Sequence, residues 1–184
     1  ATVQFQSGIG AGSSLIFGTS DDQATFNATV GAASIYGGAG DDTFTFAAAV
    51  EGATIDAGDD TDSLVFGQEM SGRISGLYST GEFVSFSNSG ATVQFESSIG
   101  VGSTIQSGDG DDSMVFVAAI TNANTTGGIT LDAGLGSDTL EFRQAFAGNL
   151  SNLSSANEFV SFSNSGATVQ FQSGIGAGSS LIFG

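Results

Sequence analysis

Apolar and polar residues alternate in short stretches that recur about every twenty residues along the chain. In segment 43–46, sequence TFTF, one polar residue separates the two phenylalanines, so both rings project from the same face of an extended strand. A period of two predicts β-strands that each have one apolar face. The same alternation recurs in further blocks, whose inward pairs are Ala24 and Phe26, Leu64 and Phe66, Val84 and Phe86, Met114 and Phe116, Leu140 and Phe142, and Val160 and Phe162.

Two more apolar positions repeat together with these strands. One precedes the polar turn of each block and is occupied by Leu15, Ile35, Ile55, Ile105 and Leu131. The other follows the last phenylalanine of the block and is occupied by Val30, Val50, Met70 and Phe146. Three repeated apolar columns are what a solenoid requires, because each coil covers the apolar side chains of the coil before it. We therefore predict an all-β fold, a parallel β-solenoid of the β-roll or β-helix kind with coils of about 20 residues.

A longer repeat relates the two ends of the chain. Residues 1–18, ATVQFQSGIGAGSSLIFG, recur without change at 167–184, an offset of 166 residues. Within this unit, FVSFSNSGATVQF occurs at 83–95 and again at 159–171. We expect one continuous solenoid over 1–184. It contains related half-units 1–90 and 91–166 of a 166-residue tandem repeat, and 167–184 begins the next copy. About eight coils would make each unit a rod roughly 40 Å long.

The turn between the two strands of a block is rich in glycine and aspartate. Segment 37–45, GGAGDDTFT, matches the nonapeptide G-G-x-G-x-D-x-U-x, where U is a large apolar residue. On this motif the chain resembles the RTX, or haemolysin-type calcium-binding, repeat family, as a segment of a giant tandem-repeat bacterial surface or extracellular protein. The resemblance implies a parallel β-roll whose turn carbonyls and aspartates bind Ca²⁺ between stacked turns. Related turns lie at 18–24, 58–64, 108–114 and 134–140.

The motif positions give a set of calcium ligands that the resemblance implies. They are Gly38, Gly40, Asp42, Gly108, Gly110, Asp112, Gly136, Asp138, Asp22, Asp60 and Asp62. Two turns depart from the family's pattern, because Ser20 and Asp60 stand where the second turn glycine is found elsewhere. The motif also recurs only once per coil, whereas the family places a calcium turn on each side. The resemblance further implies export of the unfolded chain and folding outside the cell in the presence of Ca²⁺.

The charged residues support a hard cation independently of the family. In register, the acids form two columns at strand spacing, one of Asp22, Asp42, Asp62 and Glu82 and one of Asp112, Asp138 and Glu158. Like charges about 5 Å apart cost on the order of 1 kcal/mol each even in water. The chain has two Lys+Arg against 19 Asp+Glu, so it cannot neutralise these columns itself. Oxygen donors without imidazole or thiolate select Ca²⁺ among the common metals.

The composition also limits the functions open to the chain. A net charge of -17 argues against binding to nucleic acid or direct membrane insertion. The absence of His and Cys removes imidazole and thiolate nucleophiles, ordinary zinc sites and disulfides. Paired carboxylates can serve glycosidases, but here the acids recur with the structural period, so we expect no enzyme.

These features predict a non-enzymatic structural rod of a secreted repetitive protein. It would act in a surface layer, an adhesin stalk or an extracellular matrix filament, with other copies of the same repeat as partners, joined covalently or stacked end to end. Two alternatives remain open, a carbohydrate- or partner-binding module that uses the irregular loop 122–128, and a self-assembling filament subunit. Candidate N-glycosylation triplets begin at Asn27, Asn124, Asn149 and Asn152, although such triplets are common by chance.

Overall fold

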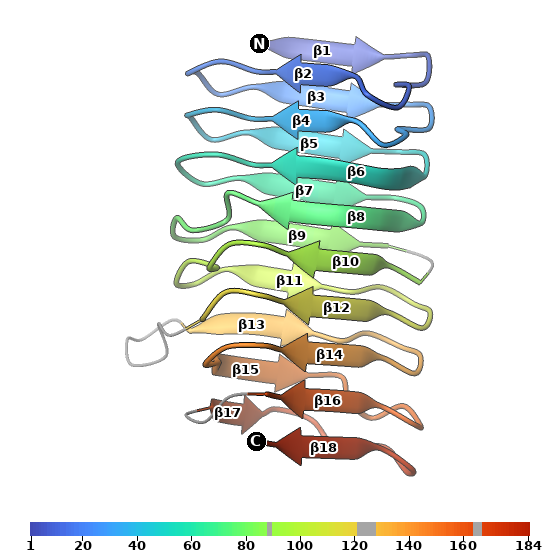
Figure 1. Cartoon of the computed structure of the whole chain (residues 1–184), viewed down its shortest axis with the longest axis vertical. Helices are drawn as coiled ribbons and strands as arrows, with labels where there is room; N and C mark the ends of the chain where they lie inside the picture. Colours follow the sequence, from blue (N-terminus) through green and yellow to red (C-terminus); the bar gives the residue numbers. More distant parts are fainter. Residues whose placement is uncertain (88–89, 121–127, 164–166) are drawn as a thin grey trace.

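Eighteen short strands and no helix make up the described part of the chain, which in this computed structural model comprises residues 1–87, 90–120, 128–163 and 167–184. The strands alternate between two parallel nine-stranded sheets, here called sheet A and sheet B. Figure 1 shows the two sheets as layers whose strands point in opposite directions, with the chain ends at opposite ends of the stack. The predicted parallel β-solenoid with coils of about 20 residues is confirmed.

Sheet A contains the odd-numbered strands. They are β1 (Thr2–Phe5), β3 (Gln23–Phe26), β5 (Thr43–Phe46), β7 (Ser63–Phe66), β9 (Phe83–Phe86), β11 (Thr104–Gln106), β13 (Ile129–Asp132), β15 (Ala147–Ser151) and β17 (Thr168–Phe171).

Sheet B contains the even-numbered strands. They are β2 (Ser14–Ile16), β4 (Ser34–Tyr36), β6 (Val50–Asp56), β8 (Met70–Ser75), β10 (Thr92–Phe95), β12 (Ser113–Phe116), β14 (Thr139–Phe142), β16 (Phe159–Phe162) and β18 (Ser180–Phe183). Each coil therefore has one strand in each sheet and two turns. We call the row of turns that lead from sheet A to sheet B the A-to-B edge, and the opposite row the B-to-A edge.

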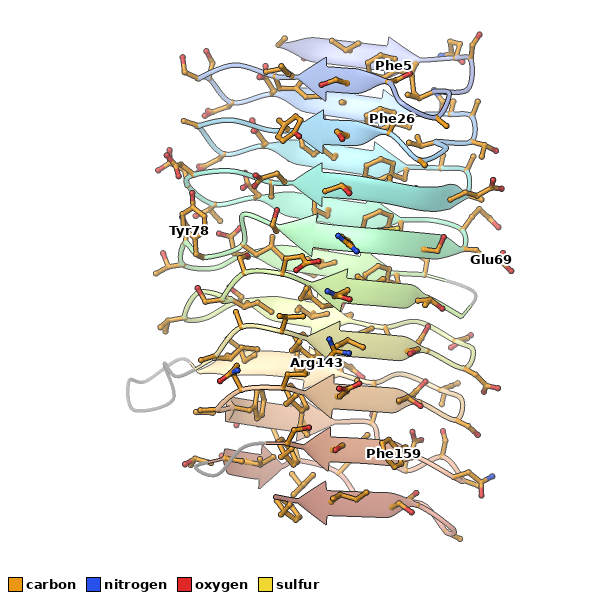
Figure 2. All side chains as sticks on the ribbon, in the orientation of Figure 1. Phe5, Phe26, Glu69, Tyr78, Arg143 and Phe159 are labelled. Atoms are coloured by element: carbon orange, nitrogen blue, oxygen red, sulfur yellow. The ribbon has the colours of Figure 1, made fainter. Side chains whose placement is uncertain are left out.

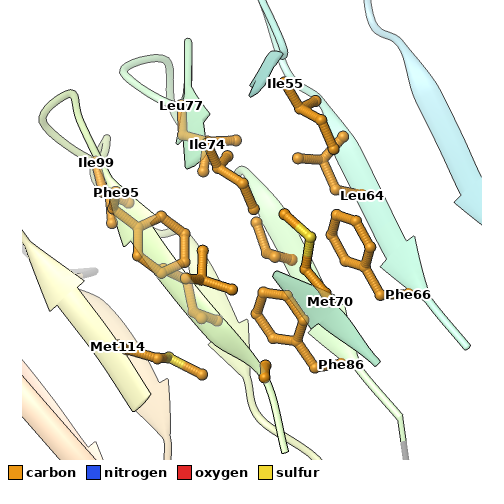
Figure 3. Close-up of a cluster of buried hydrophobic side chains, with 14 of the residues drawn as sticks. Ile55, Leu64, Phe66, Met70, Ile74, Leu77, Phe86, Phe95, Ile99 and Met114 are labelled. Atoms are coloured by element: carbon orange, nitrogen blue, oxygen red, sulfur yellow. The ribbon is translucent and has the colours of Figure 1, made fainter. Parts of the chain in front are cut away.

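The core lies between the two sheets and consists of the predicted apolar columns. The inward side chains of β5 and β7 are completely or almost completely buried, and Phe46 pairs in register with Phe26 and Phe66. The rings of Phe46 and Phe66 stack with centroids 4.8 Å apart and planes 4° apart. Turn residues such as Leu77 and Ile99 close the core at its edge, as Figure 3 shows. Each coil thus buries the aromatic face of the previous one.

The phenylalanine columns exchange sheets halfway along the chain, which the twenty-residue spacing did not predict. In the first half the stacked rings lie in sheet A, and in the second half they lie in sheet B. The exchange occurs because β10 (Thr92–Phe95) is the next strand after β9, so Phe95 follows Phe86 after nine residues instead of twenty. The extra strand adds half a coil.

The half-coil also divides an apolar column that the sequence analysis treated as continuous. Ile35 and Ile55 pair in sheet B, whereas Ile105 and Leu131 pair in sheet A. A second half-coil, β17 after β16, restores the original arrangement. As a result, the identical segments 1–18 and 167–184 occupy the same sheets, with β1 and β17 both in sheet A and β2 and β18 both in sheet B.

Candidate metal-binding site

The acidic columns form two lines along the solenoid, which we call the inner ladders. Each acid directly precedes a strand and is almost completely buried. The first inner ladder, on the B-to-A edge, consists of Asp22, Asp42, Asp62 and Glu82. The second, on the A-to-B edge, consists of Asp112, Asp138 and Glu158. The two predicted acid columns are therefore present, but the half-coil places them on opposite edges of the rod.

Backbone hydrogen bonds link the acids of each inner ladder. The carboxylate of one coil accepts the backbone N–H of the acid in the preceding coil: Asp22 donates to Asp42 Oδ1 at 2.8 Å, and Asp42 donates to Asp62 Oδ1 at 2.9 Å. The second ladder repeats this bond from Asp112 to Asp138 Oδ1 at 3.0 Å. The last acid of each ladder is a glutamate that accepts in the same way. Glu82 accepts the N–H of Asp62, and Glu158 accepts that of Asp138.

Alanine begins each inner ladder and serine ends it. Ala91 donates its N–H to Asp112 Oδ1 at 2.5 Å, and the amino group of Ala1 pairs with Asp22. At the other end, Glu82 donates to Ser103 Oγ and Glu158 donates to Ser179 Oγ, both at 3.1 Å. A neutral hydroxyl thus replaces the carboxylate as acceptor where the acidic column stops.

One carboxyl oxygen of most ladder acids is buried without a hydrogen-bond partner. Among the described residues, these atoms are Asp42 Oδ2, Asp62 Oδ2, Glu82 Oε1, Asp112 Oδ2, Asp138 Oδ2 and Glu158 Oε1. A buried, charged oxygen without a partner is costly. Each of these carboxyl groups would therefore be stabilised by a proton or by a bound cation.

Burial changes the acid–base behaviour of the same groups. It raises the pKa of Asp62, Glu82 and Asp138 to about 7, against the opposing effect of the backbone N–H that each accepts. Burial also raises the pKa of Asp112, to about 6, and it raises the pKa of Asp42 and Glu158. Without a cation, the fold accordingly favours the protonated carboxyl at these positions.

A second set of aspartates extends in the opposite direction along the rod. The exposed Asp21 accepts the N–H of Asp41 at 3.0 Å, Asp41 accepts that of Thr61 at 2.9 Å, and Asp111 accepts that of Ser137 at 2.8 Å. The donor here belongs to the following coil. An Asp-Asp pair in one turn therefore binds both neighbouring coils. The turn motif did not indicate a role for these residues, although the repeated Asp-Asp dipeptide was a signal.

The turn glycines have a structural requirement of their own. Gly38 has φ +113°, and a Cβ there would lie 1.8 Å from the carbonyl oxygen of Gly18. Gly40, Gly110 and Gly136 also have positive φ. Asp60 occupies the corresponding position with φ 74°, and its Oδ2 accepts the N–H of Gly40 at 3.1 Å. Close stacking of the turns is thus sufficient to explain the glycines.

The donor atoms at the turns are oxygens, the type that hard cations prefer, but carboxylates alone do not enclose a cation. Among the described residues, no three acids gather into a group that could hold a metal ion by themselves. Backbone carbonyls would have to complete any site. Those of Gly38 and Gly108 accept the N–H of Asp59 at 2.8 Å and of Leu135 at 3.1 Å, and a carbonyl oxygen keeps a second lone pair. Buried carboxyl oxygens together with such carbonyls are the donor set that Ca²⁺ prefers.

The other predicted sites are scattered. Asn27 is exposed, Asn149 is half-buried in β15, and Asn152 donates to Asp132 Oδ1. Asn124 and residues 122–127 of the predicted binding loop lie outside the described residues. Two surface hollows, of about 460 Å³ on sheet B beside Arg73 and about 370 Å³ at the A-to-B edge beside Asp109, contain no inner-ladder acid.

Comparisons of the chain with protein-family models, curated proteins and solved structures gave no match. The family resemblance therefore rests on the turn motif alone. In the part of the chain that the structure describes, no helix has the length and apolar character needed to cross a bilayer.

Proposed function

We propose that the chain is a non-enzymatic structural rod of a secreted repetitive protein, acting in a surface layer, an adhesin stalk or an extracellular matrix filament. The observation that carries the proposal is the placement of the repeated segment. Segments 1–18 and 167–184 are identical and occupy the same two sheets, eight coils apart in the strand order. Another copy joined to the chain would therefore continue both sheets without a break.

The length of tandem chains tests this proposal. With strands stacked about 4.8 Å apart, each added 166-residue unit should lengthen the particle by about 40 Å and leave its cross-section unchanged. Small-angle X-ray scattering on one-, two- and three-unit chains would measure both dimensions. A maximum dimension that fails to grow by a constant increment, as for units folded separately on flexible joints, would contradict the rod.

We also propose that Ca²⁺ stabilises the rod at its turns. The support is the set of buried carboxyl oxygens without partners in the inner ladders. The ligands would be the acids Asp42, Asp62, Asp112 and Asp138, with carbonyl oxygens of turn glycines such as Gly38. Bound calcium would supply the positive charge that two Lys+Arg cannot provide for these oxygens.

Thermal melting at pH 8, in chelator and in excess Ca²⁺, tests the calcium proposal. A site that is loaded a hundredfold above its Kd should add about 2.7 kcal/mol to the free energy of unfolding. Asp62→Asn should reduce the gain, whereas Glu69→Gln should keep it, because Glu69 is exposed on the edge that carries no ladder in that half (Figure 2). Equal melting temperatures with and without Ca²⁺ would refute calcium binding. The rod proposal would be unaffected, because the scattering experiment tests it separately.

For a chain of residues 1–184 alone, we propose end-to-end stacking as a further way to extend the rod, because the core of this segment is open at both ends. The terminal coils leave several core residues only partly buried, namely Phe5, Ile9, Leu15 and Phe17 at one end and Ala167, Val169, Phe171 and Leu181 at the other. Open strand edges with uncovered apolar columns are suited to pairing with another chain. Electron microscopy at rising concentration should show fibres, and Val169→Glu with Leu181→Glu should abolish them.

A further inference from the structure

The charges of this acidic chain are distributed unequally over its surface. The strands of sheet A contain a single charged residue, Asp132. Asp132 is the last residue of β13, and its Oδ1 accepts hydrogen bonds from Gly134 and Asn152 at the A-to-B edge. Every other acid of the chain lies in a turn, or in or directly after a strand of sheet B. The outer face of sheet A is therefore almost neutral in a chain of net charge -17.

Most outward side chains of sheet A are short and carry hydroxyl or methyl groups, and the longer ones are neutral apart from Asp132. The longer neutral side chains are Gln4, Gln23, Phe83, Gln106, Asn149 and Gln170. Thr45 aligns with Thr25 on one side and with Val65 on the other, and Val65 aligns with Ser85. These positions alternate with buried core residues in β5 and β7, so they form a column on the outer face. The strands keep nearly the same direction along the whole rod (Figure 1). A long face of mostly short, neutral side chains in straight columns suits packing against another sheet.

Sheet B differs from sheet A in its charges. Its strands carry Glu51, Asp56, Arg73 and Glu141. Arg143 follows β14, and its guanidinium pairs with Glu141 at 2.8 Å (Figure 2). A second acidic chain that approached sheet B or either edge would meet carboxylates of like sign, whereas on sheet A it would meet almost none. Depletion of charge is also the compositional signal of an interface core.

We propose that sheet A is a lateral docking surface for sheet A of a second copy of this chain, so that two rods pair side by side. Sheet B and the two edges, with exposed aspartates such as Asp41, then remain in solvent. The contact itself requires no calcium, because no residue of the inner ladders lies on this face.

The size of the face sets the expected strength of pairing. Nine strands spaced about 4.8 Å apart, each about 13 Å long, give a face of roughly 500 Å² per chain. A standard stable interface buries about 800 Å² per partner, so single chains should pair weakly. In a tandem array each further unit adds the same area, and the association constant should rise steeply with the number of units.

Sedimentation equilibrium of one-unit and two-unit chains tests this proposal. The measurements use chelator, up to about 1 mM protein and about 0.15 M salt, because salt limits long-range repulsion. We expect a reversible dimer that forms at much lower concentration for the two-unit chain. Scattering from the dimer should show the length of a single rod with a larger cross-section. A dimer of doubled length would indicate end-to-end stacking and would overturn the proposal, as would monomers throughout.

Two substitutions in one coil give a matched pair. Thr45→Glu places a charge on the outer face of sheet A, and Thr54→Glu places the same charge on sheet B, opposite Arg73 in the neighbouring strand. Thr45→Glu should weaken dimerisation about tenfold or more, and Thr54→Glu should leave it unchanged. If circular dichroism shows that Thr45→Glu does not fold, the double variant Gln23→Glu with Gln106→Glu repeats the test. Both glutamines are exposed, and glutamate has nearly the same shape as glutamine. Equal effects of charge on both sheets would refute docking through sheet A.

Discussion

The two halves of the molecule follow one sequence pattern but place it on opposite sides of the rod. In the first half the phenylalanine rings stack in sheet A and the inner ladder follows the B-to-A edge. In the second half the rings stack in sheet B and the ladder follows the A-to-B edge. The alternation within a strand decides which side chains face the core, and the number of preceding strands decides which sheet the strand joins. A segment as short as 91–95 can therefore exchange the sheets without disturbing the core.

The largest expected effect comes from truncating a stacked ring in each half. Phe66→Ala and Phe116→Ala both remove a fully buried ring that stacks on two others, so each should lower the free energy of unfolding by about 3–5 kcal/mol. Chemical denaturation would measure both. Phe83→Ala, on the outer face of sheet A, should cost far less. If the two substitutions lowered the free energy of unfolding by different amounts, the cores of the two halves would not be equivalent.

The inner ladders should make both halves less stable as the pH rises in the absence of Ca²⁺. Burial raises the pKa of Asp62 and of Asp138 from 3.8 to about 7 in the folded state, so folding takes up protons. Their contribution is fully present below the unfolded pKa near 4 and is lost as the pH rises through about 7. We expect the melting temperature in chelator to fall between pH 4 and pH 8.

Neutral substitutions would show how much of this loss of stability comes from each half of the molecule. Asp62→Asn and Asp138→Asn imitate the protonated acids, and at pH 8 each should recover on the order of 1 kcal/mol. Glu69→Gln, on the edge that carries no inner ladder in that half, controls for the loss of one surface charge. Stability that does not change from pH 4 to pH 8 in chelator would contradict this account of the ladders.

The serines that end the two ladders should differ in importance. Ser103 is buried and its hydroxyl accepts the N–H of Glu82, whereas Ser179 makes the same bond in the half-buried last coil. Ser103→Ala leaves a buried N–H without a partner and should cost about 1–2 kcal/mol. Ser179→Ala should cost clearly less, because water can replace the hydroxyl. Thermal unfolding of the two variants checks the order, and equal costs would contradict it.

The smallest effect concerns a turn found only in the first half. Asp60 has a left-handed backbone where the second half has Gly110 and Gly136. Asn also tolerates this conformation and can keep the bond from Gly40. Asp60→Asn removes one negative charge from a crowded edge, so it should raise the free energy of unfolding by a few tenths of a kcal/mol. Denaturation midpoints at low and high salt would show the gain shrinking with salt.

Much of this fold could be predicted from sequence because its signals are local and repeated. The inward phenylalanines, such as Phe46 and Phe116, follow from strand alternation, and the two acid columns follow from the common spacing. The half-coil was missed because the twenty-residue step of Phe26, Phe46, Phe66 and Phe86 stops before the extra strand begins, and a constant period was assumed beyond it. The nine residues from Phe86 to Phe95 carried that information.

The site was less predictable than the fold. Spacing places Asp42 beside Asp62, but it does not reveal that one oxygen accepts a backbone N–H while the other is buried without a partner. Nor does it show that Asp41 extends toward the opposite neighbour from Asp42. Such details depend on the direction of each side chain along the rod, which the alternation between inside and outside does not specify.

The change of edge has a mechanical consequence. Repulsion within a line of carboxylates tends to lengthen the edge that carries it, so a rod with all its acids on one side would bow away from that side. Here the first half of each unit would curve in one direction and the second half in the opposite direction. The two curvatures offset each other over eight coils. A chain of net charge -17 can therefore keep the overall direction of its axis when the ionic strength or the protonation of its edges changes.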